Sequence, residues 1–123
     1  MATKTETAHR GEFIVSEANG TRSRETVTVL SGTPALTPGE VLGLVTASDK
    51  YTVYDNGASD GSEAAAAVLV DPVDASTGDV SGVVVITADA ELRKSGLTFQ
   101  SGQDAAAQTA AFADLKSLGI KAR

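Results

Sequence analysis

Two groups of carboxylates are the residues of this sequence whose types and spacing come nearest to a chemical site. The first group, Asp55, Asp60 and Glu63, lies in the segment DNGASDGSE. Hard cations such as calcium bind several oxygen ligands on a flexible turn that contains glycine. An EF-hand loop, however, needs acidic or amide residues at alternate positions before its glycine, and this segment lacks that spacing. We therefore interpret it as a solvated turn, and keep a small calcium-dependent binding or adhesion module as the alternative function.

The second group, Asp71, Asp74 and Asp79, has the residue types of a general acid and base. A general acid needs a buried or crowded carboxyl, and the polar sequence around these residues gives no sign of one. We interpret them as solvated and keep a hydrolase as a further hypothesis. His9, the one histidine, stands in a polar segment where an imidazole is ordinarily solvated.

The missing residue types and motifs exclude much enzyme chemistry. The chain has no cysteine, which excludes disulfides, thiolate catalysis and cysteine-ligated zinc. It contains no phosphate-binding loop, dinucleotide fingerprint or nucleophile elbow. We predict that the protein is not an enzyme and has no cofactor and no metal site.

Charge is divided unevenly along the chain, whose formal net charge is −6. Residues 1–24 hold four Lys/Arg against three Asp/Glu, a net charge of +1, and residues 25–123 hold six against thirteen, a net charge of −7. An acidic body without a basic, aromatic patch disfavours direct binding of nucleic acid. The longest apolar run, residues 64–70, is far too short to cross a membrane, so we expect a soluble protein.

The first thirty residues form an extended arm in our interpretation, and residues 31–123 form the body. Residues 1–12 are polar and without period, an apolar cluster follows at residues 13–15, and residues 26–30 alternate like a strand. Apolar side chains on such an arm favour docking to another protein, although they also suit covering the chain's own core. Arg22 and Arg24 would point the same way in an extended segment and fork onto carboxylates of a partner, or be solvated. The predicted contact residues are Phe13, Ile14, Val15, Arg22, Arg24, Val27 and Val29.

The body is predicted to be rich in strands. Residues 41–46 and 51–54 read as a hairpin, a strand begins near Ala66, and residues 82–88 are strongly β-patterned. A polar loop is expected over residues 71–82 and an extended piece over residues 92–99. The clearest helix is capped by Ser101 or Asp104, carries a stripe of Phe112, Leu115 and Leu118, and ends at Gly119 before an extended end. The fold class is α+β: a small β-rich domain with hairpins and a partly open or barrel-like sheet, one C-terminal helix and an N-terminal arm.

These residues together resemble bacteriophage head decoration proteins, the capsid-stabilising group typified by phage lambda. The most specific part is the segment EFIVSEANG at residues 12–20 followed by RSR at residues 22–24. The order of later segments agrees over roughly residues 10–123. Those segments are PGEVLG at 38–43, KY at 50–51, YD at 54–55, DGS at 60–62, the valine-rich strand at 83–86 and LGI at 118–120. Where such proteins often have an aromatic residue and a proline, this chain has residues 99–102, FQSG.

The resemblance implies a structural protein of the virion. It implies a homotrimer at the three-fold positions of the expanded icosahedral head that clamps neighbouring subunits of the major capsid protein. It places the protein on the outer capsid surface, and in the host cytoplasm during assembly. An arm that adds a strand to an edge of the capsid protein would supply backbone hydrogen bonds with little demand on sequence. Three arms in each trimer would make attachment multivalent.

Overall fold

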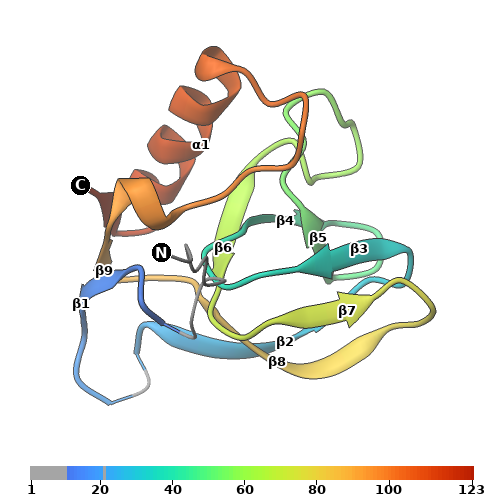
Figure 1. The fold of residues 1–123 in the computed structure, drawn as a ribbon, viewed down its shortest axis with the longest axis horizontal. Coiled ribbons are helices and arrows are strands. Elements are labelled where there is room, and N and C mark those ends of the chain that lie inside the picture. The colour runs from blue at the N-terminus through green and yellow to red at the C-terminus, as the bar shows by residue number, and fades with distance from the viewer. Residues whose placement is uncertain (1–10, 21) are drawn as a thin grey trace, which may run out of the picture.

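The centre of the fold is a closed five-stranded β-barrel (Figure 1). The computed structural model describes residues 11–20 and 22–123. The barrel strands follow one another in the order β2 (Arg24–Val29), β5 (Lys50–Val53), β4 (Val41–Val45), β6 (Ala65–Leu69) and β8 (Val80–Ile86). The predicted class, a β-rich domain with a barrel-like sheet and a C-terminal helix, is confirmed.

Two small sheets flank the barrel. A three-stranded sheet has β9 (Ala90–Leu92) at its centre, with β1 (Ile14–Glu17) antiparallel on one side and β10 (Ile120–Ala122) parallel on the other. A two-stranded sheet pairs β3 (Thr33–Leu36) with β7 (Val73–Ala75). The first sheet therefore brings both ends of the described chain together at one end of the molecule (Figure 1).

The predicted hairpin is formed by β4 and β5. Leu42 pairs with Val53 and Leu44 with Tyr51 in an antiparallel register. Asp49 closes the turn with a positive φ of 59°, a conformation that Asp adopts more readily than most residues other than Gly. This pairing confirms the hairpin. A hairpin of this kind is predictable because its turn residues and its alternating strands lie within one short stretch of sequence.

The apolar run of β6 reflects a strand that is buried on both faces. Ala67 and Leu69 belong to a cluster that draws on all five barrel strands and fills the barrel. Val68 and Val70 belong to a second cluster, which lies between the barrel, the three-stranded sheet and the helix. A strand covered on both sides favours apolar residues along its whole length, which explains why residues 65–69 show no alternation.

The helix α1 (Ala105–Ser117) begins at Asp104, whose carboxylate accepts a 2.9 Å hydrogen bond from the backbone N–H of Ala107. The helix covers one end of the fold, where Ala107, Ala111 and Leu115 are buried. The predicted stripe is therefore only partly right. Leu115 is in the core, but Phe112 is half-buried and Leu118 is 38% exposed beyond the last turn.

Two predicted loops contain regular structure. The expected polar loop at residues 71–82 includes β7 and the beginning of β8. The expected extended piece at residues 92–99 contains the 3₁₀ helix η1 (Lys94–Gly96). β7 and η1 are only three residues long, and β8 begins in polar sequence. Long-range pairing and packing therefore decide these elements, rather than the local sequence pattern. The extended end after Gly119 is confirmed as β10.

The predicted division at residue 30 stays a prediction, and described strands before it pair with strands after it. Strand β2 pairs with β8 along residues 24–29, and β1 pairs with β9. Residues 13–20 and 22–29 thus pack with the body. The physical reason is that these strands complete the barrel and cover the second core cluster. The polar residues 1–10 and Thr21 lie outside the described residues.

Candidate functional site

Phe13 is a core residue, 1% exposed, in the cluster outside the barrel. Its backbone oxygen accepts a hydrogen bond from the N–H of Arg93 over 2.6 Å. A Cβ atom added to Gly96 would stand 2.9 Å from the Cβ of Phe13, so the chain after β9 approaches Phe13 this closely only because residue 96 is glycine. Of the two interpretations of Phe13, the structure of the single chain matches the one in which it covers its own core.

Strand β1 is an edge strand of its sheet, since β9 is the only described strand that pairs with it. Ile14 packs partly against the core. Val15, by contrast, is 55% exposed, the most exposed large apolar side chain among the described residues. An edge strand with an exposed apolar side chain is a template for adding another strand.

Arg22 and Arg24 fork onto carboxylates, as their spacing suggested, but these carboxylates belong to the same chain. Arg24 donates to both oxygens of Glu17, over 2.9 and 2.8 Å. That bidentate pair lowers the pKa of Glu17 and raises the pKa of Arg24. Arg22 makes a looser 3.4 Å ion pair with Asp89, and both side chains are largely exposed.

The turn between β1 and β2 is held by a buried serine. Ser23 accepts a hydrogen bond from the N–H of Ala18 over 2.9 Å and donates one to the backbone oxygen of Asp89 over 2.6 Å. These bonds fix β1 against β9 at the point where the chain turns into the barrel. The guanidinium pair therefore braces the base of the edge strand rather than reaching toward a partner.

Val27 and Val29, the last two predicted contact residues, face the barrel. Val29 is fully buried, and Val27 packs against the interior cluster. The pairing of β2 with β5 is short, since it consists of one residue pair, Val29 with Tyr51. A polar hollow of about 280 Å³ lies there, lined by Glu25, Thr26, Val27, Thr28, Asp49 and Tyr51.

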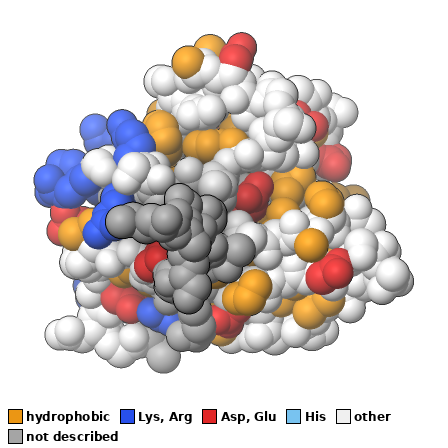
Figure 2. All heavy atoms as spheres, viewed as in Figure 1, with side chains coloured by type: hydrophobic (Ala, Val, Ile, Leu, Met, Phe, Trp, Pro, Cys, Tyr) orange, Lys and Arg blue, Asp and Glu red, His pale blue; other side chains and the backbone are white. Residues whose placement is uncertain are grey.

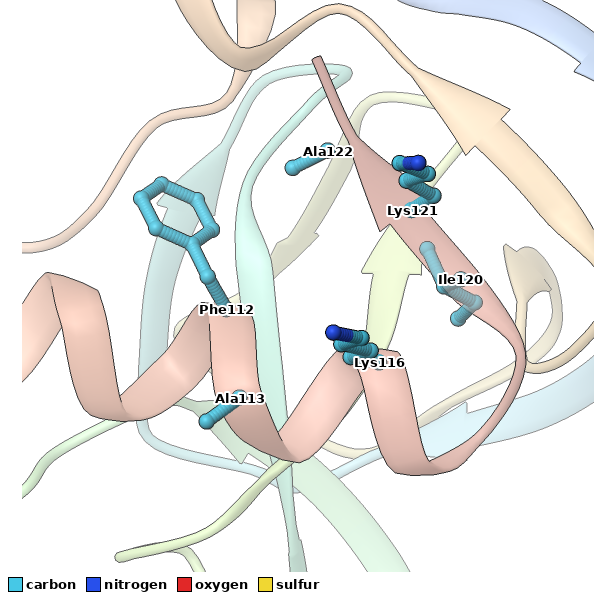
Figure 3. Close-up of a pocket in the computed structure, with 6 residues that line it drawn as sticks. All are labelled: Phe112, Ala113, Lys116, Ile120, Lys121 and Ala122. Carbon is cyan, nitrogen blue, oxygen red and sulfur yellow. The ribbon is translucent and has the colours of Figure 1, made fainter.

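An apolar pocket of about 260 Å³ opens between the end of α1 and β10 (Figure 3). Its lining residues are Phe112, Ala113, Lys116, Ile120, Lys121 and Ala122. The ammonium of Lys94 lies 4.7 Å from the centre of the Phe112 ring, a cation–π contact. We call this site the α1–β10 pocket. It lies beside the three-stranded sheet that carries the exposed edge of β1.

Comparison with known protein families identifies the chain. The family model of the bacteriophage lambda head decoration protein D matches residues 3–120. This chain belongs to that family. No curated protein matches the chain at a significant level. The protein is thus a phage head decoration protein, a structural component associated with the capsid.

The calcium-like loop of this head decoration protein uses its carboxylates to hold its own turns. Asp60 accepts from the N–H and the hydroxyl of Ser62, over 3.0 and 2.5 Å, which lowers the pKa of Asp60. Glu63 accepts from the N–H of Gly61, and Asp55 from the N–H of Gly57. Within residues 11–20 and 22–123, no three His, Cys, Asp or Glu residues are grouped to hold a metal ion.

The aspartates considered for a hydrolase are engaged in separate contacts. Asp74 accepts from Ser76, and Asp79 accepts from Lys50 and from the N–H of Ser31. These bonds lower the pKa of both carboxyls, whereas a general acid at neutral pH needs a raised one. The family is one of structural capsid proteins, not a class of enzymes.

Among the described helices, none has the length and apolar character to cross a membrane.

Sequence reasoning missed two features of the decoration protein. Glu40 is 8% exposed and hydrogen-bonded to Thr98, and its burial raises the pKa of its carboxyl. The second is the α1–β10 pocket, because the sequence pattern places Phe112 only in a helical stripe with Leu115 and Leu118. The signal that was available is the spacing of Phe112, Lys116 and Lys121, which places an aromatic ring and two cations around the end of the helix.

Proposed function

We propose that this decoration protein binds the expanded phage head as a homotrimer at three-fold positions of the major capsid protein lattice. We further propose that its N-terminal segment adds a strand to an edge of the capsid protein. Membership of the head decoration family supports the capsid role. The trimer and its symmetry position follow from the resemblance stated for the sequence.

The open edge of β1 is the observation that carries the strand addition. A turn at residues 11–13, closed by a hydrogen bond from the N–H of Ile14 to the backbone oxygen of Gly11, leads into β1, which has an exposed Val15 and an unpaired edge. Residues 1–10 are polar and contain no large apolar side chain apart from Met1. A segment of this kind binds through its backbone, which suits strand addition to a partner.

The predicted contact set divides by exposure under this proposal. Val15 and the exposed part of Arg22 stay available to the shell. Phe13 and Val29 act indirectly, because they hold β1 and β2 in place from inside the fold. Ile14, Arg24 and Val27 are half-buried and support the same strands.

Truncation of residues 1–10 tests the strand addition without removing any residue of the described core. Co-sedimentation with expanded, undecorated heads measures binding, and size-exclusion chromatography with light scattering measures the oligomeric state. We expect a folded trimer that no longer sediments with heads at concentrations that saturate the full chain. Equal binding by the truncated and full chains would contradict the role of the arm. A full chain that does not sediment with expanded heads would contradict the proposed decoration of the head.

A further inference from the structure

The α1–β10 pocket carries a concentration of positive charge that stands out on an acidic protein. Lys94, Lys116 and Lys121 surround it, and none of them forms an ion pair with a residue in the described part of the chain. The chain as a whole has a net charge of −6. Figure 2 shows Lys and Arg side chains gathered at one edge of the face seen there, on the side where the C-terminus lies in Figure 1.

The floor of the pocket is apolar and preformed. Phe112 packs edge to face on Phe99, with ring centres 5.8 Å apart, and Phe99 packs likewise on the buried Tyr54 at 6.0 Å. The hydroxyl of Tyr54 donates to the backbone oxygen of Ala107 in α1 over 2.8 Å. This row of rings ties the pocket wall to the helix and the barrel, so an incoming side chain meets a surface with little ordering cost.

We propose that the α1–β10 pocket is a second contact with the shell, which takes an apolar side chain flanked by carboxylates from the major capsid protein. This inference rests on the proposed function. The chemistry of the recognised segment follows from the site. The pocket, with its apolar floor and a volume of about 260 Å³, fits one large apolar side chain. The lysines at its rim fit acidic residues beside that side chain.

Position in the fold favours the capsid protein over a second copy of this chain. β1 and β10 are the two edges of one three-stranded sheet, and each pairs with β9. This sheet lies at the end of the fold where the chain enters β1, and the pocket is at the same end (Figure 1). A capsid protein that holds the N-terminal segment is therefore close to the pocket as well.

Charge reversal with a matched control tests this contact. Lys116→Glu changes the charge of the pocket rim, and Lys50→Glu makes the same change on the barrel, where Lys50 pairs with Asp79. We expect Lys116→Glu to weaken binding to expanded, undecorated heads about tenfold at low salt, because small losses at each site add over a trimer. Added salt should reduce the difference in head-binding affinity between Lys116→Glu and the wild type, because it screens the charges at the pocket rim. Lys50→Glu should bind like the wild type, and all three should have the same oligomeric state.

A photo-cross-linker identifies the occupant directly. Ala113 is exposed and lines the pocket, so Ala113→benzoylphenylalanine places the reactive group at its wall. On decorated heads, we expect the cross-linked peptide to come from an acidic segment of the major capsid protein. A cross-link to a second copy of this chain, or no cross-link at all, would overturn the assignment.

Failure of this inference is distinguishable from failure of the proposed function. If the wild type binds expanded heads and Lys116→Glu binds them equally well, the pocket is not a shell contact while the decoration role stands. If Lys116→Glu dissociates the trimer, the pocket belongs to an interface between copies, and the inference is likewise overturned. If the wild type does not bind heads, the proposed function itself fails.

Discussion

Phe13 and Val15 differ in exposure although they are two positions apart in one apolar cluster. Phe13 is 1% exposed and Val15 is 55% exposed. We expect Phe13→Ala to lower the free energy of unfolding by about 3 kcal/mol, because it leaves a cavity beneath the chain after β9. Val15→Ala should change it by less than about 0.5 kcal/mol and instead weaken head binding. Chemical denaturation of both variants checks this pair, and a larger loss of stability in Val15→Ala would contradict the assignment.

Glu40 supplies a pH dependence of stability whose sign follows from its burial. Burial raises the folded pKa of Glu40 above its ordinary value of 4.5, so between these two pKa values the folded chain binds more protons than the unfolded chain. The contribution of Glu40 to stability is therefore fully present below pH 4.5 and is lost as the pH rises through the folded pKa.

The variant Glu40→Gln removes this dependence. Denaturation at neutral pH should find the variant more stable than the wild type, and the difference should shrink as the pH falls toward 4.5. In the variant, the glutamine amide can still hydrogen-bond to Thr98. A variant that is less stable than the wild type at neutral pH would show that the carboxylate is stabilised by its surroundings.

Single residues show why the sequence predicted contacts that the fold uses internally. Ser16 contacts Glu91, 75 positions away, and Arg24 pairs with Glu17 across a turn. An apolar triplet and two arginines look the same in a sequence whether their partners lie in the same chain or in another. Only the long-range pairing of β1 with β9 separates the two.

Elements that are long or have clear turn signals were predictable, and short ones were not. The β4–β5 hairpin and α1 show their periods within a dozen residues. The short strands β3 and β7 exist because they pair with each other across about forty positions of sequence, which no local pattern reveals. The α1–β10 pocket likewise depends on how the helix end meets β10.

The connection between α1 and β10 depends on Gly119. Its φ is +84°, and a Cβ atom there would stand 2.7 Å from Oδ1 of Asp89. Gly102 also has a positive φ, +93°, but a Cβ atom there would meet nothing within 4 Å. We expect Gly102→Ala to cost about 1 kcal/mol of unfolding free energy and Gly119→Ala about 2 kcal/mol. Equal losses in thermal denaturation would show that the close approach to Asp89 relaxes freely.

At the scale of the whole molecule, one end of the fold combines the features that a shell contact needs. The β1 edge, the α1–β10 pocket and the point where the chain enters β1 all adjoin the three-stranded sheet. The barrel packs against this end through the second core cluster. The acidic remainder of the surface suits a protein that is crowded in many copies on one particle.

A reconstruction of decorated, expanded heads by electron cryomicroscopy, resolved well enough to trace the backbone, would show directly where the N-terminal segment binds. We expect trimers at three-fold positions, with the residues before β1 lying as an added strand along the major capsid protein. Density in which those residues contact only their own subunit, with no strand paired to the capsid protein, would contradict this expectation.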